Sequence, residues 1–308
     1  MEKVDKYKLL GDKILQLMEQ GLKPWEKPWL SGRRRFSNLV SGHIYTGVNP
    51  LLCNVDMLIY GYSLPYFVGF AQAKDLHWSL AKGSKATFLR WSGVIEVERE
   101  DGEVDLRFVG KWIPVYNCQL FDDSKSEVKI QDYVSKLDQQ FCAQPVLGEH
   151  DRQPAIDKYV ASTTAVIKVG KGYDAAYSPA EDIIFMPQFE QFVSTEGYYS
   201  TLLHELTHWT GHSSRCNRRQ NCNRQSTEYA FEELVAEIGS SILCENFGIS
   251  NTIPDHASYI GSWLNQMRGD KSYFWKAMGL AQSAVAFLEG LGKEKVMTKR
   301  KEQECELV

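Results

Sequence analysis

The chain has 308 residues, which is enough for two ordinary domains or one large one. Apolar residues make up 43% of it and provide material for real cores, yet no apolar run approaches the roughly 18 to 20 residues of a membrane-spanning helix, which excludes an integral membrane protein. The net charge of −4 is unevenly placed: residues 1–95 hold 13 Lys and Arg against 7 Asp and Glu, and the rest hold 22 against 32. A basic front half and an acidic back half indicate two units with different partners.

The front half begins with a predicted helix over residues 5–20, whose apolar side chains recur on one face. A loop rich in Gly, Ser, Asn and Pro follows, and residues 50–60 are predicted to form a buried helix. The stretch YFVGFAQAKDL indicates a strand or turn that leads into a short helix. The clearest strand signal is at 86–121, where the alternating arms VIEVERE and EVDLRFV flank Asp101-Gly102, a pair typical of a hairpin turn.

The polar stretch DDSKSEVKI marks a break, and we predict a linker region over 126–152 with a short helix inside. The predicted domains are therefore 1–125 and 153–292, followed by a charged tail at 293–308 that we expect to be disordered. Within the second domain we predict a helix at 153–161, a strand at TAVIKVG, two short strands in AAYSPAEDIIFMP, a helix at 196–211, a polar basic loop at 213–226, a helix at 227–247 and two more helices between 255 and 290.

Aromatic and cationic residues are interleaved through the front half. Unpaired nucleic acid needs both, because its bases stack on rings and its phosphates meet positive groups. The alternative is that the rings form the core and the cations solvate the surface. The predicted nucleic-acid contacts are Lys23, Trp25, Lys27, Trp29, Arg33, Arg34, Arg35, Lys82, Lys85 and Arg90, and the acidic hairpin from Glu96 to Asp105 is expected to lie away from them.

The stretch HELTHWTGH contains an HExxH motif. On a helix, His204 and His208 lie one turn apart on the same face, from which two imidazoles can reach one zinc ion at roughly 2.0–2.1 Å. Glu205 lies beside them as the candidate general base for hydrolysis. The apolar flanks predict a buried helix, as an oriented site requires. The alternative is an ordinary helix with exposed histidines, since the bare pattern also occurs by chance.

A third protein ligand would decide between these alternatives, since catalytic zinc commonly has three. His212 is a poor candidate, because the longer pattern HExxHxxGxxH requires a histidine where this chain has Ser214. The helical segment EYAFEELVAEIGSSIL offers Glu233 as third ligand and, one turn later, Glu237 as the acceptor behind a ligating histidine. Alternatively, both glutamates are solvated. Zinc is the cofactor that these ligand types predict, with Mn²⁺ or another divalent metal as an alternative.

The strands before the HExxH helix could hold an extended peptide by strand addition. Tyr177, in AAYSP, is a possible oxyanion donor, although a packed aromatic role is the more ordinary one. The seven cysteines are odd in number, scattered and without a CxxC pair, which predicts reduced thiols and a cytoplasmic protein.

The chain resembles the ArdC-type antirestriction proteins of conjugative plasmids and other mobile elements. The resemblance covers nearly the whole chain and rests on GLKPWEKPW, YTGVNPLLC, KGSKATFLRW and VYNCQLF in the front half, and on AAYSPAEDIIFMP, YYSTLLHELTHWTGHSSR, YAFEELVAEIGSSILC and HASYIGSWL in the back half. Two departures are NPLLC, where the family commonly has an NLL-type run, and the longer, more basic loop SSRCNRRQNC, which changes the rim of the site.

This resemblance implies an α+β protein of two domains: an N-terminal mixed α/β domain that binds single-stranded DNA and a C-terminal zincin-like metallopeptidase domain. It implies protection of incoming single-stranded DNA from restriction, and His204, Glu205, His208 and Glu233 fall on the family's metal-site positions. Two hypotheses stay open. In one, the protein coats DNA and its metal domain is structural or regulatory. In the other, it is a working endopeptidase that DNA brings to a host protein substrate.

Overall fold

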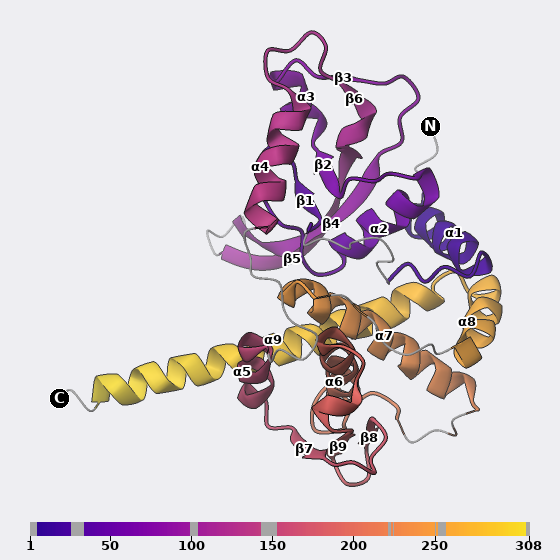
Figure 1. The fold of residues 1–308 in the computed structure, drawn as a ribbon, viewed down its shortest axis with the longest axis vertical. Helices are drawn as coiled ribbons and strands as arrows, with labels where there is room; N and C mark the ends of the chain where they lie inside the picture. Colours follow the sequence, from indigo (N-terminus) through magenta and orange to yellow (C-terminus); the bar gives the residue numbers. More distant parts are fainter. Residues whose placement is uncertain are drawn as a thin grey trace. The chain divides into compact units, whose positions relative to one another are not determined.

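A computed structural model describes residues 5–25, 34–98, 104–142, 153–220, 223, 225–249, 251 and 257–305. These residues form two compact units, and each is described by itself. The first unit combines residues 1–29 with 145–308, and the second contains residues 30–144. Helices and sheets occur in both, so the predicted α+β class is confirmed (Figure 1).

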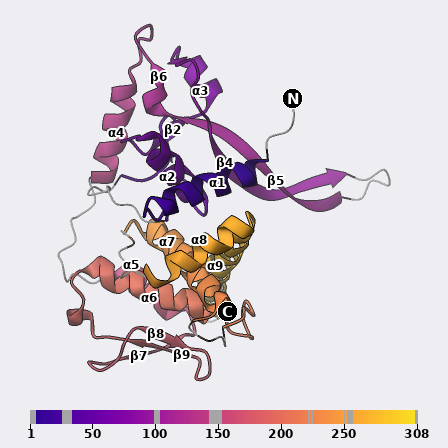
Figure 2. The same cartoon turned by 90° about the vertical axis from the view of Figure 1, so that its right-hand side faces the viewer.

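The second unit is built on a four-stranded sheet in the order β1-β2-β5-β4. The strands are β1 (Ser37–Asn38), β2 (Tyr66–Val68), β4 (Thr87–Glu98) and β5 (Val104–Asn117). The arms β4 and β5 form the predicted hairpin, whose register pairs Thr87 with Val115 and Glu98 with Val104, and Figure 2 shows it extending past the rest of the sheet. The predicted turn at Asp101-Gly102 lies outside the described residues.

Helices cover this sheet. The buried helix expected at 50–60 is α2 (Asn49–Tyr60), and the short helix after the strand is α3 (Phe70–Asp75). A small second sheet pairs β3 (Ser79–Leu80) with β6 (Phe121–Asp122). In the sequence, the hairpin and the 3-10 turn Cys118–Leu120 lie between these two strands.

The predicted linker is wrong in its first half, because α4 (Ile130–Cys142) belongs to the core of the second unit. Val134, Leu137 and Phe141 are each at most 3% exposed and pack with Tyr66, Val68 and Trp78. On the same helix, Asp138 accepts hydrogen bonds from the Tyr66 hydroxyl (2.5 Å) and from Arg34 Nε (2.9 Å) and Nη2 (2.6 Å). The unit therefore needs α4 to complete its core.

The predicted front boundary also differs, since α1 (Lys6–Glu19) packs within the first unit. Its buried face of Leu10, Ile14, Leu17 and Met18 is the one expected from the sequence. The Tyr7 and Trp275 rings meet edge to face at 5.0 Å, and the Trp275 indole donates to the Tyr7 carbonyl. The chain thus starts in one unit, builds the other, and returns.

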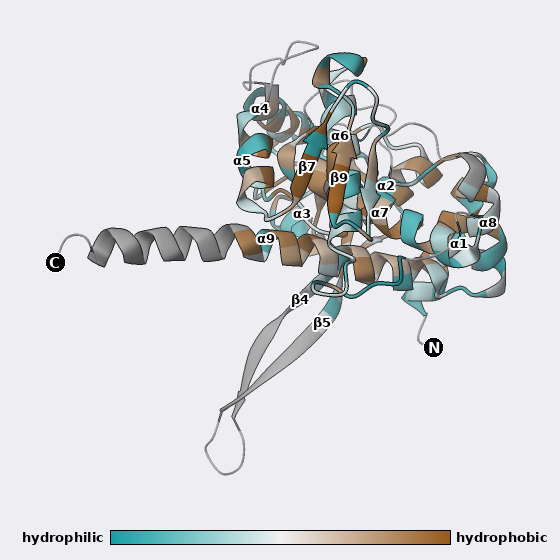
Figure 3. Ribbon diagram, turned by 90° about the horizontal axis from the view of Figure 1, so that it is seen from below, coloured by the Kyte–Doolittle hydropathy of each residue, from teal (hydrophilic) through white to brown (hydrophobic). Residues whose placement is uncertain are grey.

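The first unit is otherwise helical, with one small sheet. Its helices are α5 (Pro154–Ser162), α6 (Thr195–Trp209), α7 (Thr227–Phe247), α8 (Ala257–Gly269) and α9 (Tyr273–Cys305), and a 3-10 turn spans Phe189–Gln191. The sheet has the order β7-β9-β8, from β7 (Val166–Val169), β8 (Ala176–Ser178) and β9 (Ile183–Met186). The apolar strands β7 and β9 are visible in Figure 3, and the alternate residues Ile184 and Met186 are fully buried.

The tail expected to be disordered is wrong as far as Cys305, because α9 continues through it. Lys, Glu, Met and Arg, which dominate KEKVMTKRKEQE, all have high helix propensity. Among the described residues, no helix combines the length and apolarity needed to cross a membrane. Among the described residues, Cys53, Cys118, Cys216 and Cys244 are not in disulfide bonds.

Candidate metal centre

Two helices in close contact position the site. Helix α6 begins at Ser194, whose hydroxyl accepts from the Gly197 amide, and it is buried on nearly every side. Helix α7 begins at Ser226 in the same way and ends at Gly248, whose φ of 71° is the left-handed conformation that favours glycine. At Gly239, a Cβ atom would come within 2.6 Å of the Thr207 side chain, so this glycine permits the close approach of α7 to α6.

This packing brings the predicted ligands together. His204 Nε2 lies 3.2 Å from His208 Nε2, and the two Glu233 oxygens lie 3.5 Å from one imidazole each. A tetrahedral ion with bonds of about 2.0–2.1 Å separates its ligand atoms by about 3.3–3.4 Å. The three side chains offer atoms that all lie within 4.8 Å of one another and could hold one metal ion. The donor set and its spacing therefore fit a zinc-type site.

The field at this site favours a cation. Burial alone would lower the pKa of His208, but Glu233 and Glu232 outweigh it and raise that pKa well above its ordinary value. Burial would likewise raise the pKa of Glu233, yet the two imidazoles hold it far below its usual range. Acidic side chains that remain ionised beside two buried imidazoles are what a divalent ion requires.

Glu232, which was not predicted to take part in the site, contacts His208. Glu232 Oε1 lies 3.2 Å from His208 Nδ1. An Nδ1–H donated to this carboxylate directs the Nε2 lone pair toward the metal position. Glu237 is buried (1% exposed) one turn beyond Glu233, and its expected role as the acceptor behind a ligating histidine stays a prediction.

A buried arginine from the basic loop holds Glu232. Arg218 donates from Nε (2.9 Å) and Nη2 (2.9 Å) to the two Glu232 oxygens. It also donates to the Thr210 hydroxyl (2.8 Å) and the Thr207 carbonyl (2.7 Å) on α6. Gln220, from the same loop, donates to the His208 carbonyl and to Glu232 Oε1. The loop thus holds both Glu232 and the C-terminal end of α6 in position.

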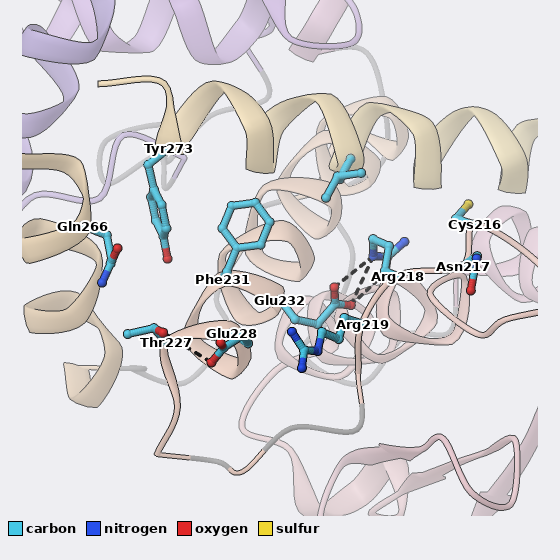
Figure 4. Close-up of a pocket in the computed structure, with 11 residues that line it drawn as sticks. Cys216, Asn217, Arg218, Arg219, Thr227, Glu228, Phe231, Glu232, Gln266 and Tyr273 are labelled. Carbon is cyan, nitrogen blue, oxygen red and sulfur yellow. Dashed lines mark hydrogen bonds and ion pairs between the residues drawn. The ribbon is translucent and has the colours of Figure 1, made fainter. Parts of the chain in front are cut away.

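The Arg218–Glu232 ion pair also borders a pocket of about 470 Å³ (Figure 4). The Arg218–Glu232 pair forms one part of its wall, and Phe231 and Tyr273, whose rings meet at 5.1 Å, form another. Burial raises the pKa of Tyr273 to about 12, so its hydroxyl stays neutral.

The candidate base is held by the edge strand β8. The Tyr177 backbone N–H donates to Glu205 Oε2 at 2.7 Å. The oxyanion role predicted for the Tyr177 hydroxyl is not supported, because that hydroxyl donates to Asp182 (2.8 Å) and accepts from Arg215 (3.2 Å). Tyr177 therefore contacts Glu205 through its backbone N–H and not through its hydroxyl.

Arg215 ties β8 and β9 to the HExxH helix. It pairs with both Asp182 oxygens, donates to the Trp209 carbonyl at 2.6 Å, and stacks over the Trp209 ring at 3.9 Å from the centroid. The pair holds the pKa of Asp182 below its usual value. Neither Arg215 nor Arg218 was expected at the site, since the sequence indicated only a polar, basic loop at 213–226.

The predicted nucleic-acid contacts separate into several groups. Trp25 is wrong as a stacking residue, because it is 2% exposed and enclosed by Trp263 and Phe274 in the first unit. Lys23 belongs to that unit too and is half-buried. In the second unit, Arg34 is paired with Asp138, Arg35 and Arg90 are half-buried, and Lys82 and Lys85 are exposed. Lys27, Trp29 and Arg33 lie outside the described residues.

Sequence families match both parts of the chain. The zincin-like metallopeptidase family matches residues 154–279, and the N-terminal domain of the anti-restriction factor ArdC matches residues 4–129. The antirestriction ArdC protein from plasmid R388 is similar over 94% of this chain in two crystal structures. The metal-free one is 32% identical (TM-score 0.70, 99% of that chain covered), and the Mn(II)-bound one is 33% identical (TM-score 0.68, 98% covered).

Curated relatives extend the comparison. Two forms of the DNA primase TraC of Escherichia coli are each 28% identical over 96% and 90% of this chain, but the chain spans only 28% and 19% of their length. The uncharacterized protein y4eC of Sinorhizobium fredii is 27% identical, with 92% of this chain and 91% of that protein covered.

Fold, site geometry and family matches together define a protein with a zincin-like metallopeptidase domain and an ArdC-type N-terminal domain. The relationship to the R388 protein is full-length and exceeds 30% identity. The chain belongs to the ArdC family of antirestriction proteins.

Proposed function

We propose that this protein is an antirestriction-type protein of a mobile element that binds single-stranded DNA and carries a zinc metallopeptidase-like site whose residues are arranged for hydrolysis. The observation that supports the hydrolytic part is the combination of a three-residue donor set with a separately held base. His204, His208 and Glu233 surround one point, while Glu205 on the same helix is oriented by the Tyr177 amide. A purely structural metal would need no base beside it.

Within this site each residue has a distinct task. The bond from Tyr177 fixes Glu205 Oε2, which leaves Oε1 to accept a proton from the attacking water and to deliver it to the departing amine. Glu232 keeps the His208 proton on Nδ1, and Arg218 keeps Glu232 in place. A bound divalent metal would supply Lewis-acid polarisation of the carbonyl and of the water.

Zinc is the proposed metal because two imidazoles and one carboxylate are its usual catalytic ligands. Manganese is the alternative, and the Mn(II)-bound structure of the R388 protein shows that a relative accepts it. The free thiols support the proposal that the protein works in the reducing cytoplasm.

The alternative to a DNA-coating role is an endopeptidase that DNA brings to a host protein. The intact base favours real hydrolysis, and the edge position of β8 favours an extended peptide as substrate. A peptidase assay on a quenched fluorescent peptide library, with zinc or manganese loaded and with or without single-stranded DNA, separates the two.

Cleavage by the parent that is lost in Glu205→Gln, with the bound metal retained, supports the peptidase. Stimulation by DNA would favour the targeting role. If the metal-loaded parent and Glu205→Gln are equally inactive on all peptides and on folded proteins, the hydrolytic proposal is wrong.

A further inference from the structure

In the part of the β4–β5 hairpin whose side chains the structure describes, one face is more exposed than the other. Directly opposite residues of an antiparallel pair share a face, so Phe88 with Pro114 and Arg90 with Trp112 lie on one side. Thr87, Leu89 and Val115 lie on the other side, are at most 6% exposed, and face α2, where the Thr87 hydroxyl donates to Asp56 at 2.7 Å. By contrast, Pro114 is exposed, and Phe88, Arg90 and Trp112 are half-buried.

This more exposed face carries rings and a guanidinium in contact. The Arg90 guanidinium lies 5.4 Å from the centroid of the Trp112 ring. It also lies across Gly110, where an added Cβ would collide with it. Farther along, Tyr116 continues the same face but packs against the core of the unit, and the Phe70 ring, 55% exposed, lies 6.5 Å from it. We call Phe70, Phe88, Arg90, Trp112 and Pro114 the hairpin strip.

The sequence segments that flank the turn-proximal part of the hairpin carry cations and no carboxylates. Residues 76–95 and 106–121 contain no Asp or Glu, and their cations are Lys82, Lys85, Arg90, Arg107 and Lys111. Lys82 and Lys85 are exposed in the loop that leads into β4, whereas Lys111 lies on the opposite face of the hairpin, with its Nζ 4.9 Å from the centroid of the Trp91 ring. The carboxylates of the hairpin are confined to its far end, between Glu96 and Asp105.

Rings on a partly exposed sheet face flanked by cations suit a strand whose bases are unpaired. Bases stack on aromatic rings and on arginine planes, and phosphates reach the lysines at the border. A duplex hides its base faces and would use only the cations. An acidic protein partner would be attracted by the cations but would not need half-exposed rings.

We propose that the hairpin strip is the surface on which this protein stacks the bases of single-stranded DNA, with Trp112 and Arg90 at its centre. The inference rests on the proposed DNA-binding function and moves its site away from Trp25 and the Arg33–Arg35 run. Of the contacts expected from the sequence, it retains Arg90, Lys82 and Lys85.

The test is fluorescence anisotropy of the full-length protein with a fluorescein-labelled oligothymidylate of about 20 nucleotides, across a salt series, with a duplex of equal length for comparison. Trp112→Ala should weaken binding about 5- to 150-fold, the equivalent of one lost stacking contact. Trp112→Phe should recover most of it. Lys82→Gln, which removes one of the proposed phosphate contacts, should lower the salt slope by roughly 0.7.

Trp91→Ala is the matched control, because Trp91 is exposed to a comparable degree (39%) on the same hairpin but points to the opposite face. It should bind within about twofold of the parent. Circular dichroism and thermal melting check that each variant is folded. If Trp112→Ala does not fold, Gly110→Ala serves as the second variant, because it displaces Arg90 without removing a ring.

The outcomes separate the inference from the function on which it rests. If the parent binds oligothymidylate and both Trp112→Ala and Gly110→Ala bind equally well, DNA binding stands and the hairpin strip is the wrong surface. Equal losses in Trp91→Ala and Trp112→Ala also overturn the assignment of this face. If the parent binds no single-stranded DNA at low salt, the proposed function fails as well.

Discussion

Replacing Arg218 by methionine should weaken metal binding from a position that touches no metal ligand. Arg218 is almost fully buried and supplies Glu232 with its two shortest hydrogen bonds, both 2.9 Å. Without it, Glu232 keeps His208 and Gln220 as partners, each at 3.2 Å, but loses its countercharge. Loss of such supporting contacts commonly costs 10- to 100-fold in metal affinity, which is about 1.4–2.8 kcal/mol.

The same change should lower the stability of the metal-free protein, since removing one partner of a buried ion pair costs roughly 3–5 kcal/mol. Competition with a chromophoric zinc chelator measures the affinity, and urea unfolding of the metal-free form measures the stability.

Two further variants identify the cause. Arg218→Lys keeps a charge but not the paired geometry, so it should fall between parent and Arg218→Met. The double variant Arg218→Met with Glu232→Gln removes both charges and should recover part of the stability but not the affinity. A folded Arg218→Met protein that binds zinc within twofold of the parent would refute the reasoning.

Other predictions follow from individual contacts. Glu205→Gln should keep the metal affinity of the parent while any peptidase rate falls about 10²- to 10⁴-fold; an equal rate would mean that Glu205 is not the base. Asp138→Ala removes the acceptor of Tyr66 and Arg34, so the free energy of unfolding should fall by about 1–3 kcal/mol in urea titrations, and an unchanged midpoint would contradict the role of α4. Arg215 depresses the pKa of Asp182 below its unfolded value of about 3.9, so this carboxylate stabilises the fold above that pH. The difference in unfolding free energy between parent and Asp182→Asn should therefore be constant above about pH 5 and shrink as the pH falls through the folded pKa. A difference that grows on acidification would contradict a lowered pKa for Asp182.

The sequence predicts the metal helices well because their signals are local. HExxH fixes two side chains on one face, and the boundaries of α7 follow from Ser226 and Gly248. The sequence does not show which of the two adjacent glutamates contacts which histidine. Glu232 and Glu233 are both buried because α7 is enclosed on several sides, and their targets depend on how α7 packs against α6, an approach that Gly239 permits.

The basic loop misleads for a related reason. Charged residues in polar loops usually solvate the surface, and nothing local distinguishes Arg215 and Arg218 from the arginines beside them. Their burial depends on carboxylates brought close from elsewhere in the chain: Asp182 from the turn between β8 and β9, and Glu232 from α7.

In the front half, the apolar spacing of α4 was the available signal for its membership in the core. Val134, Leu137 and Phe141 recur at intervals of three and four, as on one helical face. The polar stretch before them suggested a linker instead. Trp25, between two prolines in a basic segment, suggested exposure, and its burial depends on Trp263 and Phe274, more than 200 residues away.

Anomalous diffraction from crystals grown with zinc, recorded on both sides of the zinc absorption edge, tests the central claim most directly. We predict one strong peak in the first unit, with His204 Nε2, His208 Nε2 and a Glu233 oxygen at about 2.0–2.2 Å from it. A peak that lies beyond bonding distance of Glu233, or a zinc ion bound elsewhere while these three side chains are well ordered, would contradict the assignment.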